Sequence, residues 1–135
     1  MNAKPTILIV DDDEGILDTM NDILNEKGFE VAIASDGYKA IEMVKVGTFD
    51  VILMDIKMPG INGVETFKRI KAIKPLSRII FMTAYALEDV VNEAKKEGAA
   101  AVLYKPLDIE KLEKMLRNSQ ANGLSKQKFQ PYFQR

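Results

Sequence analysis

The chain alternates between short apolar runs and longer stretches in which apolar residues recur every three or four positions. The five apolar runs are residues 6–10, 29–34, 51–54, 78–82 and 100–104. Runs of this length predict strands buried on both faces, and the partial alternation of the second is typical of an edge strand. The amphipathic stripes between and after them predict five helices, at residues 16–24, 40–44, 64–70, 86–97 and 109–116.

This alternation of strand and helix predicts an α/β fold with a parallel sheet and right-handed crossovers. Five strand–helix units suit the flavodoxin-like, doubly wound (βα)5 arrangement with strand order 2-1-3-4-5, which places the first strand beside the third. The expected domain covers residues 4–118. Residues 119–135 are more polar and predict a tail or a linker.

Composition narrows the classes of function. The chain has 135 residues, 47% of them hydrophobic, and a formal net charge of −1, so the overall charge gives no sign of a surface for nucleic acid or membranes. It has no cysteine and no histidine, which excludes thiolate and imidazole chemistry and a phosphohistidine on this chain. No apolar run approaches the ~20 residues of a membrane span, and residues 1–5 lack a signal-peptide core. We therefore expect a cytoplasmic protein.

Reactive side chains stand where the apolar runs end. They are Asp11 and Asp12 after the first run, Asp55 after the third, Thr83 after the fourth and Lys105 after the fifth. Parallel strands point their carboxyl ends the same way, so these groups are expected to share one edge of the sheet. Neighbouring carboxylates repel one another, and Mg²⁺, which prefers oxygen ligands, would relieve the repulsion. Together with the ammonium of Lys105 and the hydroxyl of Thr83, these carboxylates and a Mg²⁺ site indicate phosphoryl transfer to an aspartate.

Taken singly, each of these groups has an ordinary structural interpretation. The acids at 11–13 suit the start of a helix, and Asp55 could be a turn acid before Pro59-Gly60. Thr83 alone suits a turn or a cap, and Lys105 alone a surface lysine. Their coincidence at one expected edge is what favours a site.

Short motifs surround these residues: Val10-Asp11-Asp12, Met54-Asp55 followed by Met58-Pro59-Gly60, Thr83-Ala84 and Lys105-Pro106. No piece is specific alone, but in this order, over residues 4–116, the chain resembles the receiver domain of two-component response regulators. The resemblance implies that Asp55 accepts a phosphoryl group from a kinase's phosphohistidine. It also implies that Asp11, Asp12, Asp55 and the backbone carbonyl of Lys57 hold Mg²⁺.

The same resemblance implies roles for the remaining groups. Lys105 would pair with the bound phosphoryl group, and Thr83 would move to hydrogen-bond it. The Lys105–Pro106 peptide bond is typically cis in this family. The only chemistry implied is phosphorylation and dephosphorylation of the domain itself, so the chain would not be an enzyme acting on a separate substrate.

The implied partners are a sensor histidine kinase or phosphotransfer protein and a downstream effector domain or protein, without direct contact to nucleic acid or membrane. The surface that switches would be the fourth helix, fifth strand and fifth helix, about residues 87–116. Its expected exposed side chains are Glu88, Asp89, Lys95, Lys96, Tyr104, Lys111 and Lys114. A phosphorylation-dependent homodimer through this face is compatible with the family, but no pairing pattern requires it.

The chain departs from the family at one switch position. The aromatic residue usual three positions before the lysine is replaced by Val102, and Tyr104 directly precedes Lys105. Two bulky residues, Lys57 and Tyr85, follow Asp55 and Thr83 by two positions, where they could shield the phosphoryl group from water. We therefore expect slow to intermediate dephosphorylation.

Two other functions stay open. The first is a Mg²⁺-dependent phosphohydrolase with an aspartyl nucleophile, but such enzymes need a second acid where this chain has Lys57. The second is a pseudo-receiver that is never phosphorylated, against which the complete set of acids, threonine and lysine argues. The residues name neither the kinase nor the output, and they fit a stand-alone relay protein as well as a domain of a longer regulator.

Overall fold

A computed structural model describes residues 4–85, 88–121 and 132–133. Its five longer strands are the expected apolar runs, with ends that agree to within a residue: β1 (Thr6–Val10), β2 (Glu30–Ala34), β3 (Val51–Asp55), β4 (Ile79–Thr83) and β5 (Ala101–Tyr104). A short sixth strand, β6 (Tyr132–Phe133), follows. The strands pair in parallel in the order β2-β1-β3-β4-β5-β6, which confirms the predicted order 2-1-3-4-5 and adds a strand beside β5.

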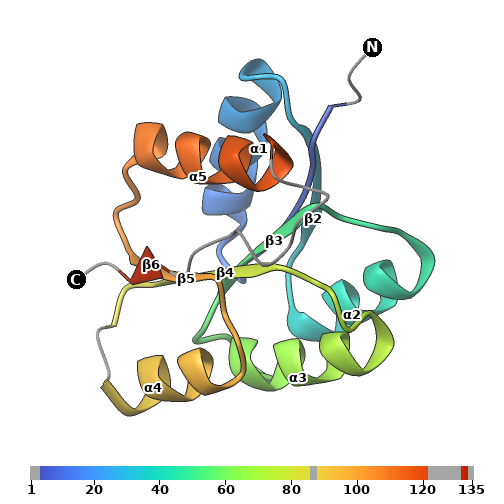
Figure 1. The fold of residues 1–135 in the computed structure, drawn as a ribbon, viewed down its shortest axis with the longest axis vertical. Helices are drawn as coiled ribbons and strands as arrows, with labels where there is room; N and C mark the ends of the chain where they lie inside the picture. Colours follow the sequence, from blue (N-terminus) through green and yellow to red (C-terminus); the bar gives the residue numbers. More distant parts are fainter. Residues whose placement is uncertain (1–3, 86–87, 122–131, 134–135) are drawn as a thin grey trace.

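Five helices cover the two faces of the sheet. They are α1 (Glu14–Glu26), α2 (Gly37–Val46), α3 (Gly63–Ile73), α4 (Glu88–Lys96) and α5 (Ile109–Ala121). Figure 1 shows α1 and α5 on one face and α2, α3 and α4 on the other. The doubly wound architecture is therefore the expected one.

Alternation along each central strand divides the core into two apolar clusters. In β3, Ile52 and Met54 pack in the cluster under α2, α3 and α4, while Val51 and Leu53 pack in the cluster under α1 and α5. Every residue of β3 and β4 is buried, as a strand covered on both faces requires. The sheet can therefore hold groups at its carboxyl edge in fixed positions.

Side-chain caps set the points where helices leave that edge. Four caps each accept a backbone N–H from three residues further on: Asp13, Asp36, Asn62 and Asp108. Each cap satisfies one of the N–H groups that a helix start leaves unpaired. Asn62 and Asp108 thus cap α3 and α5, and the acid run at 11–13, which was expected to start a helix, caps α1 through Asp13.

Two helix ends differ from expectation. The expected start of α4 at Ala86 lies outside the described residues, and the described helix begins at Glu88. α5 continues to Ala121, beyond the expected domain end at 118, and β6 lies within the segment expected to be a tail. Gly28 and Gly98 stop their helices with positive φ angles of 97° and 92°. Among the described residues, no helix has both the length and the apolar character needed to cross a membrane.

Candidate functional site

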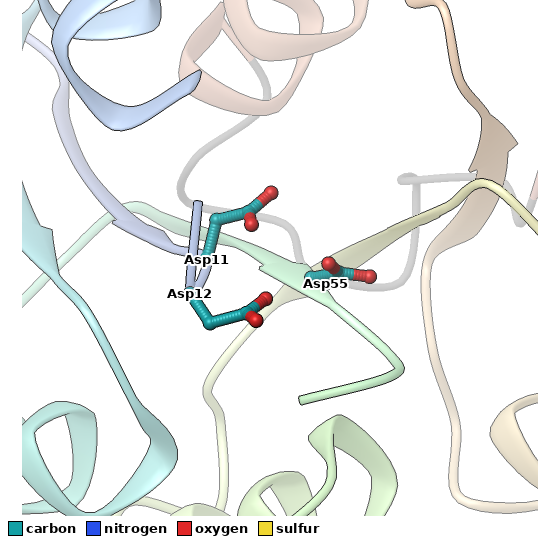
Figure 2. Close-up of side chains that lie close together, drawn as sticks. All are labelled: Asp11, Asp12 and Asp55. Atoms are coloured by element: carbon teal, nitrogen blue, oxygen red, sulfur yellow. The ribbon is translucent and has the colours of Figure 1, made fainter. Parts of the chain in front are cut away.

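Three carboxylates meet where β1 and β3 end. These strands are neighbours with Val10 opposite Met54, so the residues that follow, Asp11 and Asp55, lie side by side. Asp12 comes next in the chain, and Figure 2 shows the three side chains close together at the strand ends. One carboxylate oxygen from each lies within 4.8 Å of the others. The structure therefore brings together the three acids that the sequence placed at one edge.

A lysine from the connection between β5 and α5 joins two of these acids. The Nζ of Lys105 donates to Oδ2 of Asp11 at 2.8 Å and to Oδ2 of Asp55 at 3.2 Å. Its side chain is 18% exposed, and the Lys105–Pro106 peptide bond is cis, as the resemblance implied. The ammonium and the two acids thus form one charged cluster that is largely shielded from water.

Burial and neighbouring charges shift the pKa values within this cluster. Burial raises the pKa of Asp55; the charge of Lys105 opposes the rise and the charge of Asp11 adds to it, leaving the pKa above its ordinary value. Burial lowers the pKa of Lys105, but its hydrogen bond to Asp11 and the charges of Asp55 and Asp11 outweigh burial and raise it. Burial therefore dominates the shift of the Asp55 pKa, whereas the two neighbouring carboxylates dominate the shift of the Lys105 pKa.

Backbone N–H groups orient the two buried carboxylates. The N–H of Asp13 donates to Oδ1 of Asp11 at 2.9 Å, and the N–H of Lys57 donates to Oδ1 of Asp55 at 3.3 Å. Each bond links the acid to the second residue after it, so the loop itself fixes the direction of the side chain.

A glycine at the start of α3 supports the loop after Asp55. The N–H of Gly63 donates to the carbonyl of Ile56 at 2.7 Å. A Cβ on Gly63 would overlap the backbone carbonyl oxygen of Asp55 and lie 2.9 Å from the Cα of Ile56. Only a residue without a side chain fits there. Sequence reasoning missed this contact, since a close approach between backbones leaves no mark in the hydrophobic pattern.

Thr83 ends β4 at the same edge, but its hydroxyl is engaged in its own loop. It accepts the N–H of Tyr85 at 3.1 Å and lies 3.2 Å from the carbonyl oxygen of the same residue. This is the local turn contact that the ordinary interpretation of Thr83 expects. The hydroxyl therefore lies at the same sheet edge as the acids, but it hydrogen-bonds within its own loop.

Two exposed side chains meet beside this edge. The ammonium of Lys57 lies 4.7 Å from the ring centroid of Tyr85, which is 56% exposed. The contact connects the loop after β3 with the loop after β4, and it suits a cation–π interaction. The two bulky residues singled out in the sequence therefore touch.

The acid cluster fits a hard divalent cation. All three side chains offer oxygen, the ligand atom that Mg²⁺ prefers. Because one carboxylate oxygen of each acid lies within 4.8 Å of the others, the three acids would hold a single cation between them. The exposure of Asp12 leaves the cluster open to water on one side.

The expected switching surface is only partly as predicted. Glu88, Asp89, Lys95, Lys96 and Lys114 are exposed, whereas Tyr104 and Lys111 are half-buried. Val102, at the position where an aromatic residue was expected, is fully buried in the cluster under α2, α3 and α4. Tyr104 packs against that same cluster, so the aromatic ring in this region adjoins the core.

Comparisons with known proteins agree with the geometry. The model of the response regulator receiver domain family matches residues 7–117. The sporulation initiation phosphotransferase F of Bacillus subtilis is 40% identical over 112 residues, 83% of this chain and 89% of that protein. The transcriptional regulatory protein ZraR of Klebsiella oxytoca is 40% identical over 116 residues, 86% of this chain but 26% of that protein. The chain thus spans about a quarter of ZraR.

Solved structures give the same result. A CheY-like response regulator receiver domain protein from Methanospirillum hungatei has a TM-score of 0.82 and 31% identity, with 90% of this chain and 100% of that chain covered. The response regulator TrrA of Thermotoga maritima, solved in complex with Mg²⁺ and BeF, has a TM-score of 0.77 and 29% identity, with 85% of this chain and 98% of that chain covered.

Proposed function

The chain belongs to the response regulator receiver domain family, and from this premise we propose that it is a phosphorylation-controlled switch in a two-component pathway. Asp55 accepts a phosphoryl group from the phosphohistidine of a sensor histidine kinase or phosphotransfer protein. The phosphorylated domain then acts on a downstream effector domain or protein. The chemistry proposed is confined to the phosphorylation and dephosphorylation of this domain.

One observation carries the proposal: Asp11, Asp12 and Asp55 gather at the strand ends with Lys105 bonded between two of them. A phosphoaspartate site needs a nucleophile, positive charge for the phosphoryl oxygens and a place for a divalent cation. The cluster supplies the first two directly, and its oxygens suit the third.

In the proposed reaction, a carboxylate oxygen of Asp55 attacks the phosphorus atom of the donor. The new oxygen–phosphorus bond forms as the phosphorus–nitrogen bond breaks, and the histidine nitrogen of the donor keeps the electron pair. Lys105, whose Nζ is already 3.2 Å from Asp55, pairs with the transferred phosphoryl group.

Asp11, Asp12, Asp55 and the backbone carbonyl of Lys57 would hold Mg²⁺ beside the phosphorus. A bound Mg²⁺ supplies positive charge that offsets the charge on the phosphoryl oxygens. TrrA of Thermotoga maritima, a structural neighbour, was solved with Mg²⁺ and BeF, and this supports the same assignment here.

The switch would begin at Thr83. Its hydroxyl leaves the loop contact with Tyr85 and hydrogen-bonds the phosphoryl group, which pulls on the connection into α4. Among the described residues of α4, only Val91 and Ala94 are buried, so little apolar contact opposes a shift of this helix. The readout surface is formed by α4, β5 and α5. The phosphoryl group adds a charge of about −1.5 to −2, which shifts the equilibrium between two conformations of this surface.

The setting that we propose follows from the family. The domain works in the cytoplasm without direct contact to nucleic acid or membrane, and its output passes to another domain or protein. A homodimer formed on phosphorylation through the α4–β5–α5 surface is compatible with this scheme. Relatives such as ZraR are transcriptional regulatory proteins, which supports an effector of that kind.

The test is intact-mass measurement after incubation with a small-molecule phosphodonor and Mg²⁺. We expect one phosphoryl adduct per chain, which does not form when Mg²⁺ is chelated before the donor is added and is absent from Asp55→Asn. The matched control is Asp22→Asn, the same change at an exposed position on α1, which should be phosphorylated like the unsubstituted protein.

The other outcomes separate the remaining functions. A chain that gains no adduct with either small-molecule or phosphohistidine donors would be a pseudo-receiver, and the proposal would be wrong. Multiple turnover on phosphate esters would instead identify a phosphohydrolase. An adduct that still forms in Asp55→Asn would show that another residue accepts the phosphoryl group.

A further inference from the structure

The outer edge of β5 is not open in this chain. β6 pairs with β5 in parallel, with Tyr132 opposite Ala101 and Phe133 opposite Val102. Figure 1 shows β6 beside β5 at the end of the sheet, opposite to β2. An edge strand otherwise presents unpaired N–H and C=O groups that can pair with any extended chain. In this structure part of that edge is occupied.

β6 continues the winding of the sheet. The path from β5 through α5 to β6 is a further strand–helix–strand unit with parallel strands, of the kind that builds the rest of the domain. The sequence of β6 suits this place, because both of its residues are aromatic and aromatic residues favour strands.

This strand lies outside the part of the chain that the family accounts for. The family match ends at residue 117, and β6 comes after it. The common five-stranded fold therefore does not explain why the C-terminal segment returns to the sheet.

We propose that the β5 edge is a strand-docking site and that the C-terminal segment of the same chain occupies it through β6. The ligand class that fits this edge is an extended peptide that pairs in parallel with Ala101–Tyr104. Because β5 is the middle of the proposed α4–β5–α5 readout surface, a partner that needs this edge must first displace β6. The segment thus acts as an intramolecular competitor for partners of that kind.

Backbone pairing can be tested in the full chain without phosphorylation, so the result does not depend on the proposed function. The measurement is hydrogen exchange by mass spectrometry on peptides that cover Ala101–Tyr104. In the double variant Tyr132→Pro, Phe133→Pro, which cannot form the strand, we expect exchange in β5 to accelerate by about tenfold. Exchange in β2, at the opposite edge, should stay the same and reports that the fold is intact.

The matched control is Tyr132→Val, Phe133→Val, which removes the rings but keeps residues that favour a strand. We expect it to protect β5 as the unsubstituted chain does. Unchanged β5 exchange in the proline variant would overturn the proposal. Equal loss of protection in both variants would also overturn it, since a ring contact rather than strand pairing would then hold the segment.

A second measurement tests whether pairing is within one chain. We expect light scattering to give a monomer and β5 protection to be independent of protein concentration. A dimer whose β5 protection falls on dilution would mean that β6 pairs with a second copy, which contradicts the intramolecular assignment.

A third measurement supplies the ligand separately. A shortened chain, residues 1–121, keeps all the residues matched by the family, and solved receiver domains of that extent fold alone. A synthetic peptide of residues 122–135 should slow β5 exchange in the shortened chain and leave the full chain unchanged. A peptide without effect on the shortened chain would contradict a strand-docking site.

Discussion

At the scale of single residues, the site is defined by an imbalance of charge. Asp11 is fully buried and Asp55 is 7% exposed, and both are bonded to the single ammonium of Lys105. Burying two carboxylates against one cation costs free energy unless a further positive charge arrives. Burial is the largest cause of the raised pKa of Asp55, and the charge of Asp11 adds to it against the charge of Lys105. The ionised form of Asp55 is therefore less favourable in the folded chain than in the unfolded one.

This imbalance predicts that Asp55→Asn stabilises the protein at neutral pH without Mg²⁺. The folded-state pKa of Asp55 is raised, so above that pKa its ionisation opposes folding, and a neutral amide removes the penalty. We therefore expect the thermal midpoint of the variant to lie above that of the unsubstituted chain. Mg²⁺ should raise the midpoint of the unsubstituted chain and have less effect on the variant.

Thermal unfolding with and without Mg²⁺ measures both effects, and Asp22→Asn is the control for loss of one charge at an exposed position. The prediction would be wrong if, with chelator present, the thermal midpoint of Asp55→Asn were equal to or below that of the unsubstituted chain. Ionised Asp55 would then not destabilise the folded state.

A second residue-scale prediction concerns Gly63. Because a Cβ there would overlap the carbonyl oxygen of Asp55, Gly63→Ala must displace the loop that carries Asp55 and Lys57. We expect a loss of about 1–3 kcal/mol in the free energy of unfolding and Mg²⁺ binding about tenfold weaker by calorimetry. Gly28→Ala is the control: Gly28 has a φ of 97° and open space around it, so alanine strains the backbone far from the acids.

The control should lose about 1–2 kcal/mol of stability and keep its affinity for Mg²⁺. If both variants bound Mg²⁺ equally well, Gly63 would have a structural role only, and the contact with Asp55 would not position the site.

At the scale of elements, the apolar pattern predicted the features that recur along the chain and missed those that occur once. The five strands and the acids at one edge followed from alternation and from the rule that parallel strands end together, whereas the strand order followed from the fold class and not from the apolar runs. β6 did not follow, because a two-residue strand has no periodicity and is fixed only by its pairing with β5. Nor did the direction of the Thr83 hydroxyl, which depends on the turn at Tyr85 rather than on any pattern.

The two loops that frame Asp55 give an element-scale prediction. Lys57 over Tyr85 joins the loop after β3 to the loop after β4. Because these loops follow Asp55 and Thr83, we expect the pair to cover one approach to the acid edge. If Asp55 is phosphorylated as proposed, this pair should slow attack by water, with a phosphoryl half-life longer than seconds. The double variant Lys57→Ala, Tyr85→Ala should hydrolyse about two- to fivefold faster, the rate equivalent of a contact worth ~0.5–1 kcal/mol.

The decay of the phosphoryl adduct, followed by intact mass, measures the rate. Tyr38→Ala is the control, since Tyr38 is a similarly exposed tyrosine on α2. A half-life of seconds in the unsubstituted chain, or equal decay in the double variant, would contradict shielding by this pair.

At the scale of the whole molecule, the core holds α5 more firmly than α4. Two apolar clusters, one on each face, hold the sheet, and the charged edge lies between them. α5 is tied to its cluster by the fully buried Leu112 and by Leu116, whereas α4 buries only two of its described side chains. Because α5 is anchored in the core, we expect it to unfold only with the whole domain. α4 buries fewer side chains, and we expect it to open locally.

Leu112→Ala is therefore expected to destabilise the entire domain rather than α5 alone. Removing a fully buried leucine leaves a cavity under α5, which costs about 2–5 kcal/mol, a large part of the ~5–15 kcal/mol that a domain has. Urea unfolding should show a lower midpoint with an unchanged m-value, because the same surface is exposed on unfolding. Leu76→Ala, at a leucine that is 72% exposed, should change stability by less than about 0.5 kcal/mol. A smaller m-value in Leu112→Ala would mean that α5 detaches separately, and the two-faced core would not then unfold as one unit.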